Sequence, residues 1–221
     1  MTFIVGFSCF DGLVLCADSL EEDGYTKRIV DKLGAQTIAG EWGIGIGCAG
    51  TGPGITKFMA KLNELLGTDS YDRYKTEAVI EATLKHMQEQ YPKEAVEFVA
   101  GLWGPNETNM YRSYRDSHCL SVCPPLGFIC AGMDLSLPDV VLDSIFDNLM
   151  GVEEAARLGI FVTAIMKERV DGCGGPTRVQ LYKKGSTVWR DFEYEEVERI
   201  EKDFPMDEVY GMIYQYWRTK R

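Results

Sequence analysis

The chain has 221 residues, of which 45% are hydrophobic and 26% are charged, and its formal net charge at pH 7 is -11. A chain of this size can bury one sizeable core, whereas its acidic balance argues against a nucleic acid or an anionic membrane as partner, because both require clustered Lys and Arg. No apolar run approaches the roughly 18 to 20 residues of a membrane-spanning helix, and the first residues lack the basic-then-apolar layout of a secretion signal. We therefore expect a cytoplasmic protein that binds neither membranes nor nucleic acids.

The apolar patterns come in blocks along the sequence. The β-rich runs expected to form strands are, in chain order, 2–9, 12–18, 35–40, 42–50, 95–103, 109–115, 117–123, 127–132, 177–185 and 186–192. Apolar residues at 3- and 4-residue spacing predict amphipathic helices over about 53–66, 76–91, 140–149, 152–170 and 206–217. Segregated blocks of strands and helices indicate helices layered over antiparallel sheets rather than alternating βαβ units, so we expect an α+β fold in a single domain over 1–221.

Two short turns and one polar stretch connect the first strands. The dipeptide Asp11-Gly12 predicts a hairpin between the first two runs, and Gly40-Glu41 predicts the turn of a second strand pair. Residues 20–31 are expected to form a polar loop or ribbon.

The seven cysteines are scattered along the sequence rather than clustered. Several lie in apolar runs, where Cys behaves as a small hydrophobe, and the chain is too long to need cross-links, so reduced thiols are expected. His118, Cys119 and Cys123 lie close together in the sequence, but their spacing is not that of a zinc site and no second cluster completes four ligands. No metal site is expected.

Residues 45–50 read G-I-G-C-A-G, which matches the dinucleotide-binding pattern G-x-G-x-x-G. A parallel strand ending in an acid should follow such a motif. Instead, residues 69–91 are polar with a helical period, and the first hairpin is antiparallel. The neighbouring G-T-G-P-G at 50–54 is not a phosphate loop either, because no Gly-Lys-Ser/Thr follows it. We do not expect a nucleotide cofactor.

Three short motifs point to a known family when they are taken together. They are T-F-I-V-G at 2–6 followed by D-G-L-V-L-C-A-D-S at 11–19, D-K-L at 31–33, and C-A-G at 48–50. Together they resemble the proteasome β-subunit family of N-terminal-nucleophile (Ntn) hydrolases. The order of strands and helices also resembles that family's four-layer αββα sandwich of two antiparallel sheets, so the resemblance extends over most of the sequence.

The resemblance implies four catalytic residues. Thr2 would be the nucleophile after removal of Met1, Asp18 and Lys32 would be the charged pair beside it, and the backbone N–H of Gly50 would face the developing oxyanion. A Thr hydroxyl needs an adjacent base, and a free α-amine with a pKa of about 8 can accept its proton. A lysine ammonium helps to keep that amine neutral, and an N–H at the oxyanion contributes on the order of 3 kcal/mol. No cofactor is required.

The sequence departs from the family pattern at groups that hydrogen-bond the terminal amine. Leu20 follows the A-D-S where the family usually has Arg, and Ala131 stands where the family commonly has the Ser of a G-S-G run in the middle of the sequence. Before the late Gly-Gly, the family often has an Asp, two further residues and a Ser, where this sequence has Val170 and Cys173. Asp171 and Cys173 are therefore the candidate supporting residues.

The first hypothesis is a threonine-type peptidase that cleaves peptides or unfolded proteins inside a homo-oligomeric ring or related assembly. An ATPase unfoldase would be a natural partner of such a chamber. Two alternatives stay open: a proteasome-like subunit that assembles without cutting, and an Ntn amidohydrolase that acts on a small molecule. Retention of Met1 would favour the assembly subunit, and activity of an unassembled chain on a small amide would favour the amidohydrolase.

Overall fold

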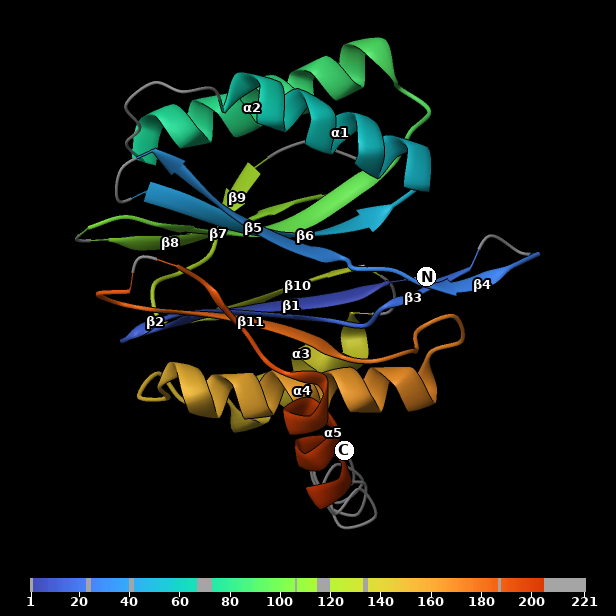
Figure 1. The fold of residues 1–221 in the computed structure, drawn as a ribbon, viewed down its shortest axis with the longest axis vertical. Helices are drawn as coiled ribbons and strands as arrows, with labels where there is room; N and C mark the ends of the chain where they lie inside the picture. The colour runs from blue at the N-terminus through green and yellow to red at the C-terminus, as the bar shows by residue number, and fades with distance from the viewer. Residues whose placement is uncertain are drawn as a thin grey trace, which may run out of the picture.

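The computed structural model describes residues 2–22, 25–39, 42–66, 73–105, 107–114, 120–132, 135–186 and 188–204. Two five-stranded antiparallel sheets lie face to face between two layers of helices (Figure 1). This arrangement confirms the predicted α+β fold with its αββα order of layers. None of the helices in the described ranges combines the length and the apolar character needed to cross a membrane.

The first sheet has the strand order β10-β1-β2-β11-β12. Its strands are β1 (Phe3–Cys9), β2 (Gly12–Ala17), β10 (Phe128–Gly132), β11 (Arg178–Lys183) and β12 (Arg190–Asp191). The predicted hairpin at Asp11-Gly12 joins β1 to β2, and every residue of both strands is buried. Because β1 lies between β10 and β2, both of its edges are hydrogen-bonded.

The second sheet has the strand order β5-β6-β7-β8-β9. Its strands are β5 (Leu33–Ala39), β6 (Trp42–Gly50), β7 (Val96–Trp103), β8 (Thr108–Ser113) and β9 (Leu120–Val122). The turn expected at Gly40-Glu41 and the start of the strand expected over 117–123 lie outside the described residues.

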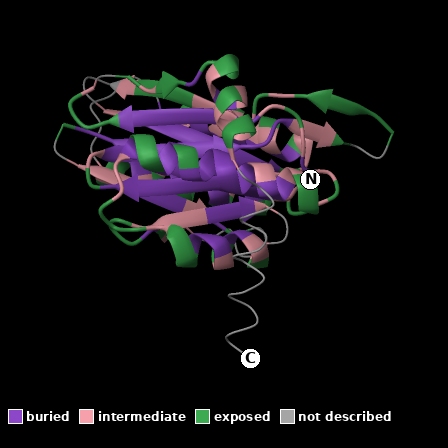
Figure 2. Ribbon diagram, turned by 90° about the horizontal axis from the view of Figure 1, so that it is seen from below, coloured by how far each residue is buried: buried purple, intermediate pink, exposed green. Residues whose placement is uncertain are grey.

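Two short strands form a separate ribbon that projects from the body of the molecule (Figures 1 and 2). They are β3 (Leu20–Glu22) and β4 (Lys27–Ile29), and they pair antiparallel. The ribbon leaves the first sheet just after β2 and leads into β5 of the second sheet, so it bridges the two sheets at one end of the sandwich. This confirms a ribbon rather than a loop over the polar stretch.

The helices cover the outer faces of the two sheets (Figure 1). The helices over the second sheet are α1 (Gly52–Leu65) and α2 (Arg73–Gln90), and those over the first sheet are α3 (Ser136–Ile145), α4 (Val152–Arg169) and α5 (Tyr194–Asp203). Helices α1, α2 and α4 agree with the predicted helices, whereas α3 begins and ends about four residues before the helix predicted over 140–149. The last one, α5, is not predicted: most of its residues are charged, and Val197 is the one residue that it buries. The helix expected over 206–217 lies outside the described residues.

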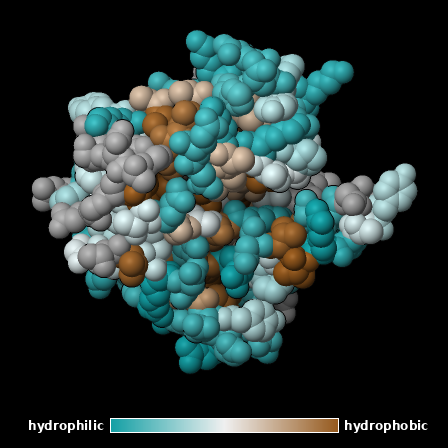
Figure 3. Space-filling view, turned by 45° about the horizontal axis from the view of Figure 1, so that its top comes forward, coloured by the Kyte–Doolittle hydropathy of each residue, from teal (hydrophilic) through white to brown (hydrophobic). Residues whose placement is uncertain are grey.

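Buried side chains form three layers of core: one beneath each helix layer and one between the sheets. Figure 2 shows the buried residues along the strands and on a helix that covers them, and Figure 3 shows a mostly hydrophilic face with small apolar patches.

Packing between the sheets explains the glycine-rich β6. A Cβ at Gly43 would lie 1.8 Å from Trp103, and one at Gly45 would lie 2.6 Å from Trp189. Gly43 and Gly45 therefore make room for aromatic rings in the core of the sandwich.

Candidate active site

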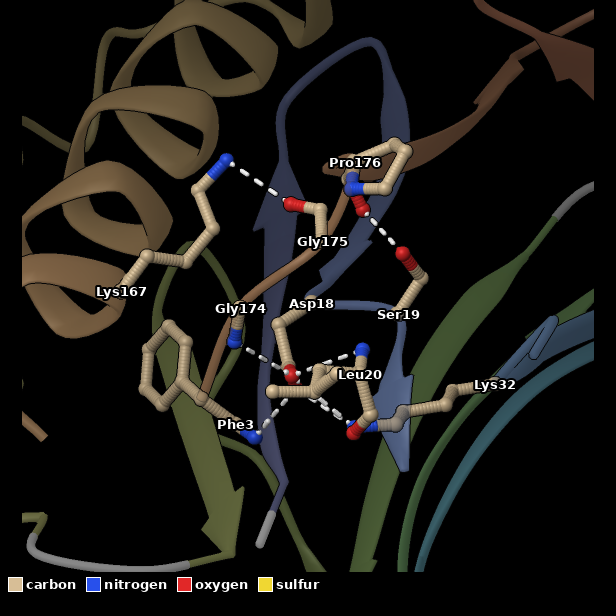
Figure 4. A network of polar contacts seen from close by, with 9 residues as sticks. All are labelled: Phe3, Asp18, Ser19, Leu20, Lys32, Lys167, Gly174, Gly175 and Pro176. Atoms are coloured by element: carbon tan, nitrogen blue, oxygen red, sulfur yellow. Dashed lines mark hydrogen bonds and ion pairs between the residues drawn. The ribbon is translucent and has the colours of Figure 1, made fainter. Parts of the chain in front are cut away.

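The carboxylate of Asp18 is the centre of a buried polar cluster at the end of β2 (Figure 4). Its side chain is fully buried, and three backbone N–H groups donate to it. Phe3 N–H donates to Oδ1 at 2.9 Å, whereas the N–H groups of Gly174 and Leu20 donate to Oδ2 at 3.1 and 3.3 Å. These three donors fix the orientation of both carboxylate oxygens.

Lys32 completes the cluster with an ion pair to Asp18. Its Nζ lies 2.9 Å from both carboxylate oxygens and 2.6 Å from the carbonyl oxygen of Leu20, and its side chain is only 6% exposed. Burial lowers the pKa of Lys32, although Asp18 opposes that shift. The resulting ammonium is held in one place and gives up its proton more readily than a solvated lysine.

Thr2 is half-buried and directly precedes β1. Two contacts fix its position: the next residue, Phe3, donates to Asp18, and Gly132 of β10 pairs with Phe3 across the sheet. Gly132 has φ +111, and a Cβ there would lie 1.9 Å from the carbonyl oxygen of Thr2. Only glycine fits this close approach.

Gly50 lies at the end of β6, immediately before Thr51, the N-cap of α1. It is exposed, has φ +135, and a Cβ there would lie 2.0 Å from the carbonyl oxygen of Ala95. The turn from strand to helix therefore requires glycine. Of the four catalytic candidates, Thr2, Lys32 and Gly50 line one cleft, and Asp18 holds Lys32 from behind.

The cleft has a volume of about 710 Å³ and an apolar lining framed by charges. Its apolar lining residues are Val30, Leu33, Ile46, Cys48, Pro53, Ile55 and Met59. Its charged lining residues form ion pairs, among them Glu21 with Arg28 at 2.7 Å and Lys57 with Glu94 at 3.3 Å.

The structure separates the two candidate supporting residues. Cys173 is buried next to Gly174, and burial together with the nearby Asp18 raises its pKa to about 11. Asp171 is exposed, and within the described ranges no hydrogen bond or ion pair joins it to Asp18 or Lys32.

Two positions where the family has polar groups are apolar here. Ala131 is fully buried opposite Ile4, and Val170 caps the end of α4 through its backbone N–H.

Sequence reasoning missed the backbone groups that complete the cluster, because an N–H donor such as that of Gly174 has no signature in the amino-acid sequence. It also left the cleft wall unassigned, since Ile46 and Met59 come from different elements and meet only in the fold. Among the described residues no group of three or more His, Cys, Asp or Glu side chains is arranged to hold a metal ion. His118 and Cys119 lie outside those residues.

The four-layer sandwich, with Thr2 at the start of a central strand beside a buried Asp–Lys pair, has the fold of the proteasome-type Ntn hydrolases. The solved structures that share it are, in particular, those of Anbu. A mutant of Anbu from Hyphomicrobium sp. strain MC1 has a TM-score of 0.83 at 17% identity, with 97% of each chain covered. Anbu (ancestral beta-subunit) from Yersinia bercovieri has a TM-score of 0.79 at 13% identity, with 97% of this chain and 96% of that chain covered.

The Anbu complex from Pseudomonas aeruginosa, solved as a helical assembly, has a TM-score of 0.78 at 17% identity, with 96% of each chain covered. No protein-family model and no curated protein sequence matches the chain. The shared fold confirms, at the level of architecture, the resemblance predicted from the three sequence motifs.

Proposed function

We propose that the protein is a subunit of a proteasome-like assembly in which Thr2 hydrolyses amide bonds of peptides or unfolded proteins. The observation that carries this proposal is the placement of Thr2 in the cleft beside Lys32, with the following residue tied to the buried Asp18. The reaction requires a free α-amine on Thr2, and hence removal of Met1 and of anything that precedes it.

The chemistry proceeds through an ester on Thr2. Its α-amine takes the hydroxyl proton as Oγ attacks the substrate carbonyl carbon, and the oxyanion that forms is stabilised by the N–H of Gly50. The protonated amine then returns its proton to the leaving amine of the substrate, which leaves an ester on Oγ. A water molecule, deprotonated by the same amine, hydrolyses the ester and restores Thr2.

Lys32 and Asp18 support this cycle electrostatically. The ammonium of Lys32 disfavours a second positive charge nearby, so it keeps the α-amine of Thr2 neutral and able to act as a base. Asp18 holds that ammonium in place with both carboxylate oxygens. Cys173 lies next to the pair, and we retain it as a supporting residue of the site. Asp171 is exposed, and we do not assign it a role there.

We extend assembly to this protein from the Anbu complex of P. aeruginosa, which forms a helical assembly. A homo-oligomeric ring or a related assembly would enclose the cleft in a cytoplasmic chamber. An ATPase unfoldase would then deliver folded substrates to it.

The test is the intact mass of the protein before and after treatment with a peptide epoxyketone, which reacts with both the hydroxyl and the amine of a terminal Thr. We expect one adduct, mapped to Thr2, and none on a Thr2→Ala variant. A protein with free Thr2 that stays unmodified in its assembled state would overturn the proposal.

That negative result would favour a second candidate, an assembly subunit that does not cut. The apolar Ala131 and Val170 favour it, because they provide no side-chain hydrogen bond to a terminal amine. An unassembled protein that forms the adduct and cleaves a small amide, but not peptides, would instead identify a small-molecule amidohydrolase.

A further inference from the structure

One short segment, residues 174–177, connects the active-site carboxylate to the outer helices. On its inner side, Gly174 N–H donates to Asp18 Oδ2 at 3.1 Å (Figure 4). The carbonyl oxygen of Gly174 accepts from the N–H groups of Leu20 at 2.9 Å and Ser19 at 3.1 Å. Leu20 in turn gives its carbonyl oxygen to Lys32. A shift of this segment therefore moves groups that hold both members of the ion pair.

At its middle the segment is packed against Ser19 and Ile29, so it cannot move further inward. Gly175 has φ +71, and a Cβ there would lie 2.7 Å from Ser19 Oγ and 2.8 Å from the side chain of Ile29. The hydroxyl of Ser19 also donates to the carbonyl oxygen of Pro176 at 2.7 Å. The inner side of the segment is thus closely packed and hydrogen-bonded.

On its outer side the segment is held by Glu201 of α5. The carboxylate oxygen Oε1 of Glu201 accepts from Lys167 Nζ of α4 at 2.6 Å and from the hydroxyl of Thr177. Lys167 also donates to the carbonyl oxygen of Gly175 at 3.3 Å (Figure 4). One oxygen of α5 therefore anchors the segment twice, directly through Thr177 and indirectly through Lys167.

These contacts differ from an ordinary surface ion pair. The side chains of Lys167 and Glu201 are 16% and 24% exposed, and Thr177 is buried. By contrast, Glu198 and Lys202 on the same helix form an exposed ion pair at 2.9 Å, of the kind that contributes little to stability. The protein thus provides its own matched control.

We propose that Glu201 is a positioning residue of the active site, which acts through residues 174–177 on Asp18 and Lys32. Its catalytic consequence rests on the proposed function, whereas its effect on the position of Gly174 does not. Removal of the Glu201 carboxylate leaves the buried hydroxyl of Thr177 without its acceptor and releases Lys167. The segment then loses its outer anchor, and the hydrogen bond from Gly174 to Asp18 lengthens.

The experiment compares Glu201→Ala with the control Glu198→Ala, using the pH dependence of the rate of epoxyketone adduct formation at Thr2. We expect Glu201→Ala to slow the reaction by on the order of tenfold and to shift its pH profile, because the ammonium that tunes the α-amine is displaced. Glu201→Gln keeps an acceptor for Thr177 and should recover part of the rate, and Glu198→Ala should match the parent. A Glu201→Ala variant with the parent's rate and pH profile overturns the proposal.

Amide hydrogen exchange separates this proposal from the proposed function, because it needs no reaction. If the parent forms no adduct, hydrogen exchange of the Gly174 N–H still tests the positioning role. Glu201→Ala should lower the protection of this N–H by about tenfold, and Glu198→Ala should leave it unchanged. Unchanged protection in Glu201→Ala overturns the positioning role. If Glu201→Ala does not fold, Thr177→Val replaces it, because it keeps the side-chain shape and removes one anchor. Thr177→Val should also lower the protection of the Gly174 N–H, and unchanged protection would overturn the positioning role.

Discussion

Replacing Asp18 with asparagine should destabilise the fold far more than a surface change of the same kind. The asparagine oxygen can still accept from Phe3 N–H and from Lys32, but its NH2 group would face the N–H donors of Leu20 and Gly174, which now bond to Oδ2. The ammonium of Lys32, only 6% exposed, would also lose its counter-charge. Breaking a buried pair in this way costs about 3–5 kcal/mol.

Thermal unfolding followed by circular dichroism measures this effect. For a protein of this length each kcal/mol lowers Tm by roughly 2–4 °C, so Asp18→Asn should lower Tm by about 6–20 °C. Lys32→Met should cost less, because the carboxylate keeps its three backbone donors. Glu22→Gln is the matched surface control, since Glu22 pairs with the exposed Lys27 at 3.6 Å, and it should change stability by less than about 0.5 kcal/mol.

A Tm of Asp18→Asn equal to that of Glu22→Gln would refute the reasoning. So would Lys32→Met unfolding at a lower temperature than Asp18→Asn, because the backbone cradle would then contribute less than the ammonium.

Three further predictions follow from the same region. Burial lowers the pKa of Lys32, so the unfolded chain binds this proton more tightly than the folded protein does. The free energy of unfolding of the parent, relative to that of Lys32→Met, should therefore rise as the pH increases from neutral towards 10.5. Urea unfolding measures this difference in stability across the range, and a fall would contradict the prediction. Gly132→Ala should displace Thr2, lowering Tm and slowing adduct formation, whereas Gly34→Ala, which has open space around it, should leave Tm unchanged. Burial raises the pKa of Cys173 to about 11, so iodoacetamide at about pH 8 should leave it unlabelled in the folded protein, and a labelled Cys173 peptide in the mass spectrum would speak against a buried thiol.

The sequence is informative where chemistry and local pattern coincide. Asp18 and Lys32 lie in short motifs next to strong strand signals, and the structure brings them within 2.9 Å. The Asp11-Gly12 hairpin and the four long amphipathic helices also follow from local residue patterns, because turn chemistry and apolar spacing act within a few residues.

What the sequence hides is non-local. The Gly174 N–H reaches Asp18 across 156 positions of the sequence, and no side chain marks it as a donor. Helix α5 buries a single residue, Val197, with Ile200 packed beside it, and most of its other side chains are charged, so few apolar residues mark it in the sequence. The G-x-G-x-x-G match misleads in the other direction, because Gly45 and Gly47 are set by packing against Trp189 and Ile4, which are distant in the sequence.

The central position of β1 has a practical consequence for how the protein is produced. Both edges of β1 are paired, and Thr2, which precedes β1, lines the cleft. Any residues fused before Thr2 would therefore begin at the wall of the cleft. On the proposed function, an affinity tag at that end would block the α-amine of Thr2, and its removal would free that amine. Handles for purification, labelling or surface attachment belong at the other end of the protein, beyond α5, which lies in the helix layer over the first sheet (Figure 1).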